Sequence, residues 1–404
     1  MADGAGIKAS KHDVFGEALL RPAAGLEAEF SLIIDDRPAT PEKVFGDPRG
    51  FLRVPLMHRT GRSFHLPTGA AIYFDTGVIE LATPVMELER GCFARLSRSL
   101  DASLTLVREQ LDQWERRTGH RARLQGFSAH YNVSPRQVGS AVGRARRCDR
   151  VAWLLAHILP APVMLLATNR ESTGVGVRPR PPRIEVTADF SPNGSRIAAT
   201  GALIAGVVTT VNTWSDLSLA ALRRARIPVI DTFAPCRHTS RRGWLAHSDC
   251  YPSNPFICDP DDRMWPTSLG RASLRDIATA VWQRFEPAVA RLADRVSFTR
   301  ARGILTGRSE SWLDQTERPA EYDDVGRNRE RSRETALLGC SRYERIILNT
   351  IARRPLHLDG TTWIPQAVSG WSRIVLRRED GVTRVMPLDA LVPFLADWDR
   401  GSDS

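Results

Sequence analysis

The chain has 404 residues, of which 42% are hydrophobic and 25% are charged, with a formal net charge of +10. This is an ordinary globular composition, long enough for one large domain or two medium ones. Only three residues are lysines, so the positive charge is almost wholly arginine. The arginines are scattered among acidic residues instead of forming a basic stripe, so the sequence does not indicate a nucleic-acid partner.

The cysteines and the apolar runs exclude other classes. The six cysteines form no CxxC pair and no zinc spacing, which is typical of reduced thiols in a cytoplasmic protein. No basic-then-apolar signal pattern opens the chain. The longest apolar run, residues 151–167, contains His157 and two prolines and is shorter than the roughly 20 residues that span a bilayer. We expect a buried core helix followed by a strand there, and no membrane partner.

In the first third of the chain, the pattern predicts a loose arm over residues 1–22, then strands over 25–35 and 51–57. Residues 72–83 are predicted to form a hairpin that turns at Asp75, Thr76 and Gly77. Apolar residues then recur at steps of three and four over 87–118, which predicts a long amphipathic helix ended by Gly119.

Further along, we expect a strand over 124–133, a helix that Pro135 opens and that runs toward His157, a loop over 169–180 and a strand over 183–189. Asn193 is a candidate cap for a helix over 194–222, and helices are expected near 271–295 and 333–353. A hairpin over 373–386 and a helix over 388–398 suggest a small module at residues 356–404, after one domain at 23–355. The fold class is α+β, with an antiparallel sheet polar on one face.

Four of these strands carry acidic or imidazole side chains at alternating positions, and alternate residues of a strand share a face. The residues concerned are Glu27, Glu29, Glu80, His130, Asn132, Glu185 and Thr187. Taken singly, each is more often a solvated or structural residue. Together they need a cation, because crowded carboxylates repel one another. Oxygen-rich ligation suits Mg²⁺ or Mn²⁺, which bind phosphates, so the pattern indicates ATP chemistry.

The motifs GLEAEF, ELATPVME, SAHYNVS and RIEVTAD, in this order over roughly residues 22–300, resemble those of carboxylate–amine ligases. The nearest branch is the bacterial and plant-type glutamate–cysteine ligases of the glutamine-synthetase fold. This resemblance implies a curved antiparallel sheet with helices on its outer face, and ATP and Mg²⁺ (or Mn²⁺) as cofactors. It also implies two metal positions, one held by Glu29, Glu80 and Glu87 and one held by Glu27, His130 and Glu185. Glu185 is the implied contact to the nucleotide phosphates. Asn132 stands where many relatives have a second His, but its amide still suits a nucleotide contact, and Arg170, in the loop before the fourth strand, is a further candidate phosphate contact.

The resemblance further implies that the γ-phosphoryl group of ATP passes to a carboxylate, and that an amine attacks the acyl phosphate to give a γ-glutamyl-type amide. The expected partners are a small carboxylate such as glutamate and an amine; a homo-oligomer stays open. Thr187 departs from the family, which has arginine there, so we expect Arg183, or else Arg308, to supply the guanidinium. The alternatives are a non-catalytic nucleotide-binding relative, and a phosphotransferase or amide hydrolase on the same metal sheet.

Overall fold

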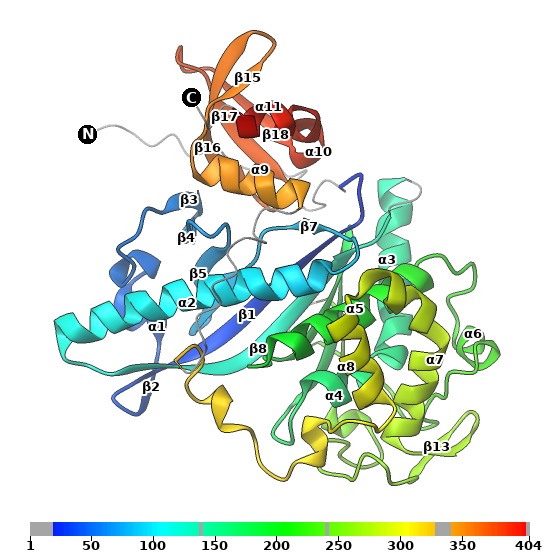
Figure 1. Cartoon of the computed structure of the whole chain (residues 1–404). Coiled ribbons are helices and arrows are strands. Elements are labelled where there is room, and N and C mark those ends of the chain that lie inside the picture. The colour runs from blue at the N-terminus through cyan, green and yellow to red at the C-terminus, as the bar shows by residue number, and fades with distance from the viewer. Residues whose placement is uncertain (1–18, 137–139, 239–241, 328–340, 401–404) are drawn as a thin grey trace.

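The computed structural model describes residues 19–136, 140–238, 242–327 and 341–400 (Figure 1). Its centre is one large antiparallel sheet with the strand order β11-β12-β9-β10-β8-β1-β6-β5-β4-β3, in which β2 and β7 also pair with β1. The strands are β1 (Ala23–Ile34), β2 (Arg37–Ala39), β3 (Met57–Thr60), β4 (Ser63–His65), β5 (Ala71–Asp75), β6 (Val78–Ala82), β7 (Met86–Glu87), β8 (Ala122–Ser134), β9 (Gly174–Arg180), β10 (Arg183–Asp189), β11 (Cys236–Arg237) and β12 (Trp244–His247). A separate hairpin, β13 (Trp265–Thr267) and β14 (Gly270–Ala272), lies outside this sheet.

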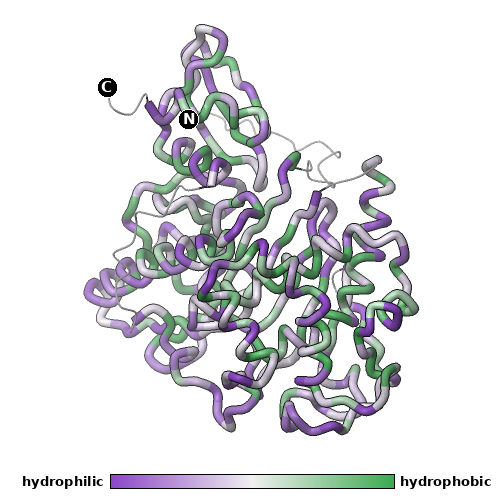
Figure 2. Tube along the Cα trace, turned by 45° about the vertical axis from the view of Figure 1, so that its right-hand side comes forward, coloured by the Kyte–Doolittle hydropathy of each residue, from purple (hydrophilic) through white to green (hydrophobic). Residues whose placement is uncertain are grey.

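Helices cover one face of the sheet, and α2 and α5 lie directly on it (Figure 1). The helices of this part are α1 (Pro41–Phe45), α2 (Cys92–Thr118), α3 (Ala141–Ile158), α4 (Pro160–Ala167), α5 (Gly194–Val211), α6 (Leu219–Arg224), α7 (Leu274–Leu292) and α8 (Arg295–Leu305). On β1 the buried apolar residues Leu26, Ala28 and Phe30 alternate with acidic ones and join the core under the helices. Figure 2 shows the hydrophobic segments gathered in this interior. The predicted fold class is confirmed, with one apolar face covered and one polar face left open.

Several local predictions match the structure. The hairpin of β5 and β6 turns at Thr76 and Gly77, both with positive φ, and Gly119 ends α2 in the left-handed conformation. Asn193 accepts hydrogen bonds from two backbone N–H groups at the start of α5. That helix is nonetheless shorter than predicted, because it ends at Val211 and α6 follows separately.

Other local predictions are wrong. Residues 51–56 form no strand, because Phe51 is buried against Phe45 and β3 begins only at Met57. Pro160 opens α4, so a second helix instead of a strand follows the core helix α3, which itself begins at Ala141 and not at Pro135. Residues 174–180 form β9 instead of a loop, since they pair with β10.

Within the described residues, one single helix, α5, is long and apolar enough to span a membrane, but 78% of it is buried inside the protein. A bent pair, α3 with α4, passes the same length and composition test. Burial of α5 between α2, α7 and α8 is what a central core helix requires. We therefore interpret it as part of the core.

The last 60 described residues build a small module on a second hydrophobic cluster, next to the open side of the sheet (Figure 1). Its elements are α9 (Arg342–Ile351), β15 (Leu356–Leu358), β16 (Thr361–Ser369), β17 (Arg373–Arg377), β18 (Thr383–Pro387), α10 (Leu388–Leu391) and α11 (Leu395–Arg400). Strands β15 to β18 form a sheet in chain order, and β16 packs against β3 of the central sheet. The module therefore forms a wall beside the polar face.

Candidate functional site

The polar face of the central sheet gathers carboxylate and imidazole side chains from neighbouring strands. Directly opposite residues of an antiparallel pair project from the same face. Glu29 lies opposite Glu80 on β6, and Glu27 lies opposite His130 on β8. All four side chains are buried. The structure therefore brings together four of the seven residues that the strand alternation singled out.

Two overlapping groups of potential metal ligands lie in this cluster. Glu27, Glu80 and His130 form one group, and Glu29, Asp75 and Glu80 form the other; the ligand atoms within each group lie within 4.8 Å of one another. Carboxylate oxygens with one imidazole suit Mg²⁺ or Mn²⁺. Buried carboxylates this close repel one another unless a proton or a cation neutralises them. The residues present therefore fit divalent cations, with Glu80 shared.

The electrostatics of the cluster favour binding of a positive charge. Burial, followed by the negative charge of Glu27, raises the pKa of Glu80 to about 8. Burial also raises the pKa of Tyr73 far above its usual range, so its hydroxyl stays a donor to Glu80 Oε1 at 2.5 Å. Burial disfavours the charged form of His130. The hydrogen bond between His130 and Glu27 nonetheless favours it, so the pKa of His130 is raised and the pKa of Glu27 is lowered. At neutral pH, Glu80 thus holds a proton that a cation would displace.

This proton makes stability depend on pH. The folded chain keeps the Glu80 proton up to a pKa of about 8, whereas the unfolded chain loses it near its ordinary pKa of 4.5. Folding therefore takes up a proton in this window, and metal-free stability should fall as pH rises through it. Because Mg²⁺ binds the ionised carboxylate, the rise in melting temperature that Mg²⁺ causes should be larger at about pH 8.5 than at about pH 6. Glu80→Gln should abolish the difference, and thermal denaturation at the two pH values checks it.

Three further residues, Tyr73, Asp75 and Ser128, belong to this site and were not predicted as site residues from the sequence. Tyr73 and Asp75 share a face of β5, two residues apart, although the glycine turn signal predicts only a turn at Asp75. Ser128 Oγ donates to Glu29 Oε2 at 2.5 Å and lies 3.2 Å from His130 Nε2. Continuing the alternation into the turn would have found Asp75. Ser128 lies two residues before His130 in an unbroken stretch of β8, so the same alternation would have found it.

Glu185 lies on the same face but outside both ligand groups. It pairs with Arg178, and its Oε2 lies 3.2 Å from Arg180 Nε, both on β9. On the neighbouring strands, Asn132 lies opposite Glu185 and its Oδ1 accepts from Arg183 Nε at 2.7 Å. Two arginines therefore neutralise Glu185 where the resemblance implied a metal ion.

Glu87 is not brought to Glu80, contrary to the expectation that both hold one ion. Glu87 is the last residue of β7 and precedes α2 in the chain. Its carboxylate faces the start of α9. Arg342 Nε donates to Glu87 Oε1 at 2.8 Å, and the Ser341 hydroxyl and the Tyr343 backbone N–H donate to Oε2. A carboxylate at a helix N-terminus is favoured by the helix dipole. Glu87 thus joins the module to the central sheet.

Glu87→Gln should therefore lower stability instead of metal binding. The change leaves the half-buried Arg342 and the buried Ser341 donors with a weaker acceptor, so we expect a loss of about 1–3 kcal/mol in the free energy of unfolding. Mg²⁺ affinity, measured by calorimetry, should stay within about twofold of wild type, since the ligand groups are intact. Loss of Mg²⁺ binding without loss of stability would restore Glu87 as a ligand.

Two predicted arginines lie away from the cluster. Arg170 donates to the backbone carbonyls of Gln315 and Ile257, which turns its guanidinium toward a surface loop and not toward a nucleotide on the polar face. Arg308 is exposed just after α8, in the helical layer, and the sheet separates that layer from the polar face. Arg183 remains as the predicted guanidinium that reaches the site.

A groove of 1360 Å³ opens between the polar face and the module. Its described lining includes Glu27 and Asn132 on the central sheet, the hairpin between β9 and β10, and the outward face of β16, β17 and β18. Arg59 lines the groove, its guanidinium stacks on Trp371 of the module at 3.8 Å, and its Nε donates to the Gly370 carbonyl. The arginines that line the groove, set against Glu27 as the lining carboxylate, are Arg59, Arg180, Arg183, Arg242, Arg373 and Arg377.

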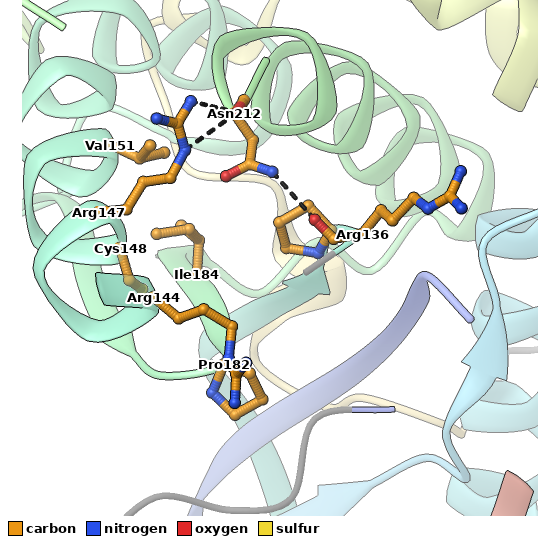
Figure 3. A pocket seen from close by; sticks show the side chains of 9 residues that line it. Arg136, Arg144, Arg147, Cys148, Val151, Pro182, Ile184 and Asn212 are labelled. Atoms are coloured by element: carbon orange, nitrogen blue, oxygen red, sulfur yellow. Dashed lines mark hydrogen bonds between the residues drawn. The ribbon is translucent and has the colours of Figure 1, made fainter. Parts of the chain in front are cut away.

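A second pocket, beside α3, is too small for a substrate. It has a volume of 20 Å³, room for about one water molecule, and Arg147 in its lining donates to the Asn212 carbonyl (Figure 3). Arg136 and Arg144 line it without a carboxylate among its lining residues. We assign it no ligand.

No protein-family model matches the sequence, and no curated protein matches it. Among solved structures, the chain is similar to that in the complex between the prokaryotic ubiquitin-like protein Pup and its ligase PafA, with a TM-score of 0.54 and 12% identity over 94% of this chain and 93% of that one. The chain therefore has the fold of PafA. A structure of PafA in complex with ADP is also similar, with a TM-score of 0.43 and 11% identity over 84% of this chain and 90% of that one. Membership of the glutamate–cysteine ligase family stays a prediction.

Proposed function

We propose that this protein is an ATP-dependent carboxylate–amine ligase. The observation that carries the proposal is the juxtaposition of a buried carboxylate–imidazole cluster with an arginine-lined groove on one sheet face. Carboxylates that hold a divalent cation, placed beside guanidinium groups, are what binding of a nucleoside triphosphate requires. The fold shared with a ligase supports the same assignment.

The groove offers the residues for a nucleotide. Guanidinium groups bind phosphate oxygens through paired hydrogen bonds, and the Trp371 ring with its stacked Arg59 offers a platform for a base. A Mg²⁺ ion on the ligand groups would neutralise phosphate charge during transfer. Arg183 donates to Asn132 and lines the groove together with Glu27, so its guanidinium would bind the transferring phosphoryl group.

The reaction that fits is phosphoryl transfer from ATP to a carboxylate, which yields ADP and an acyl phosphate. An amine then attacks the acyl carbon, forms the amide and releases phosphate. The amine must lose a proton, and Asp75 at the edge of the ligand groups is a carboxylate within reach of Glu29 and Glu80. Residues from four strands thus hold the reacting groups in one place.

The carboxylate substrate is either a small amino acid such as glutamate or the carboxylate of a polypeptide. The groove exceeds the roughly 300–1,000 Å³ of ordinary small-molecule sites, which favours a nucleotide together with part of a larger substrate. PafA has a protein partner, Pup. Thr187, opposite His130, is the feature that favours the second candidate function, a nucleotide-binding relative without ligase activity.

A phosphate-release screen tests the function. Purified protein, ATP and Mg²⁺ or Mn²⁺ are incubated with amino acids or acidic peptides and with primary amines, and product is identified by mass spectrometry. Phosphate release that requires both a carboxylate and an amine supports the ligase. Nucleotide binding without release under any combination would favour the non-catalytic relative, and release that needs water alone would favour a hydrolase.

A further inference from the structure

A β-bulge interrupts β8 beside the carboxylate cluster. Ala28 of β1 pairs with Ala129, but Phe30 pairs with Gly126, so Glu29 lies opposite two residues, Phe127 and Ser128. A bulge of this kind re-aims side chains and is frequent beside active sites. It changes which residues of β8 lie next to Glu29.

The bulge adds Phe127 to the polar face, beside Ser128, which shares that face with His130 by ordinary alternation. A Cβ on Gly126 would meet the Phe190 ring at 2.8 Å, and Phe190 packs against Phe30 under the helices, so Gly126 faces the helical layer. Its neighbour Phe127 therefore points to the opposite, polar face. Ser128 Oγ binds Glu29 on that face as well. In a regular strand two consecutive residues would not share a face.

Phe127 is unusual because 56% of it is exposed in the middle of a central strand. Its backbone carbonyl accepts from the Phe190 N–H, so it is part of the sheet and not of a loop. The next row of the polar face runs through residues that lie opposite one another on four strands and are half-buried. We call this row together with Phe127 the far shelf; its members are Asp75, Val78, Ser31, Gln125 and Phe127.

The far shelf lies at the opposite end of the cluster from the arginine groove. The groove lining reaches Gly25, Glu27 and Asn132 but not Glu29 or Ser128. Since a strand rises about 3.4 Å per residue, Ser31 lies roughly 20 Å along β1 from Gly25. A second substrate can therefore approach the cluster from the shelf while a nucleotide occupies the groove.

The chemistry of the far shelf is specific. It presents two apolar side chains, Val78 and Phe127, one carboxylate, Asp75, and no cationic side chain among its five members. An ammonium group is attracted both to a carboxylate and to the face of an aromatic ring, and an alkyl stem packs on apolar surface. A primary amine on an apolar stem matches all three properties.

We propose that Phe127 determines which amine the enzyme accepts: its ring holds the apolar stem of a primary alkylamine whose ammonium lies beside Asp75. This proposal rests on the proposed ligase function, because it assigns the shelf to the attacking amine. The β-bulge brings the Phe127 ring next to Glu29.

Binding of n-pentylammonium to the full-length protein, followed by NMR titration, tests the assignment. Each methylene removed from apolar contact costs roughly fourfold in affinity, so Phe127→Ala should weaken binding by about tenfold. Phe127→Leu, which restores apolar area, should stay within about twofold of wild type. Val296→Ala, at an exposed apolar residue on α8, is the matched control and should change nothing.

Unchanged pentylammonium affinity in Phe127→Ala would overturn the proposal. An equal loss of methylammonium affinity in Phe127→Ala would also overturn the proposal, because methylammonium has no alkyl stem that could pack on the ring. Binding of a fluorescent ATP analogue with Mg²⁺ is measured on the same samples. Absent nucleotide binding in the wild type would count against the ligase function, whereas the pentylammonium titration judges the shelf on its own.

Discussion

Replacing Glu29 with Gln should lower ATP-dependent turnover by on the order of 10²–10⁴ while leaving the fold intact. Glu29 belongs to the ligand group with Asp75 and Glu80, and it accepts from Ser128. The change removes one negative charge from this group, so a divalent cation loses a ligand and the transferring phosphoryl group loses its counter-charge. Glu27→Gln and Glu80→Gln should behave alike, because the two ligand groups overlap at Glu80.

Phosphate release measures turnover, and Mg²⁺ titration by calorimetry measures the metal affinity that should fall with it. Glu109→Gln, at an exposed carboxylate of α2 in the helical layer, is the matched control and should be neutral. Glu29→Gln with wild-type turnover would show that the chemistry does not pass through this ligand group. Melting temperatures of both variants exclude unfolding as the cause of any loss.

Patterns local in sequence predicted the parts of the site that depend on one strand. Period-two alternation placed Glu27 with Glu29, and a turn signal placed the hairpin that carries Glu80. Such signals need only a few neighbouring residues, since the pleat decides the face of each side chain. The same alternation also covers Asp75, but a residue next to a glycine turn resembles a turn residue, so Asp75 was not predicted as part of the site.

Features that depend on contacts between two distant segments could not be predicted from the sequence. Glu87 is bound by residues about 254 positions away, and no local pattern reveals that α9 begins there. The groove exists because the module packs beside β3, so Arg59 meets Trp371 only in the folded chain. The bulge at Phe127 is a property of the pairing between β1 and β8, not of either strand alone. These relations come from tertiary packing.

Replacing Arg183 with Ala should lower turnover by about 10³-fold, or roughly 4 kcal/mol of transition-state stabilisation, with little effect on ATP affinity. A phosphoryl group in transfer spreads negative charge over its equatorial oxygens, and a guanidinium stabilises that charge through paired hydrogen bonds. Thr187 has no guanidinium, and Arg183 lies on the same strand face and lines the groove next to Glu27.

Arg308→Ala is the control, because its exposed side chain follows α8 on the helical side of the sheet. Arg183→Lys should recover little of the turnover that Arg183→Ala loses, since lysine keeps the positive charge but not the planar pair of donors. Single-turnover kinetics with saturating ATP separates this effect from nucleotide binding. If Arg183→Ala retains full turnover and Thr187→Arg raises it, no guanidinium of this face serves the transfer. The carboxylate cluster would then bind nucleotide for a purpose other than ligation, because an ordered metal site without its cationic partner stabilises bound ATP but not its transition state.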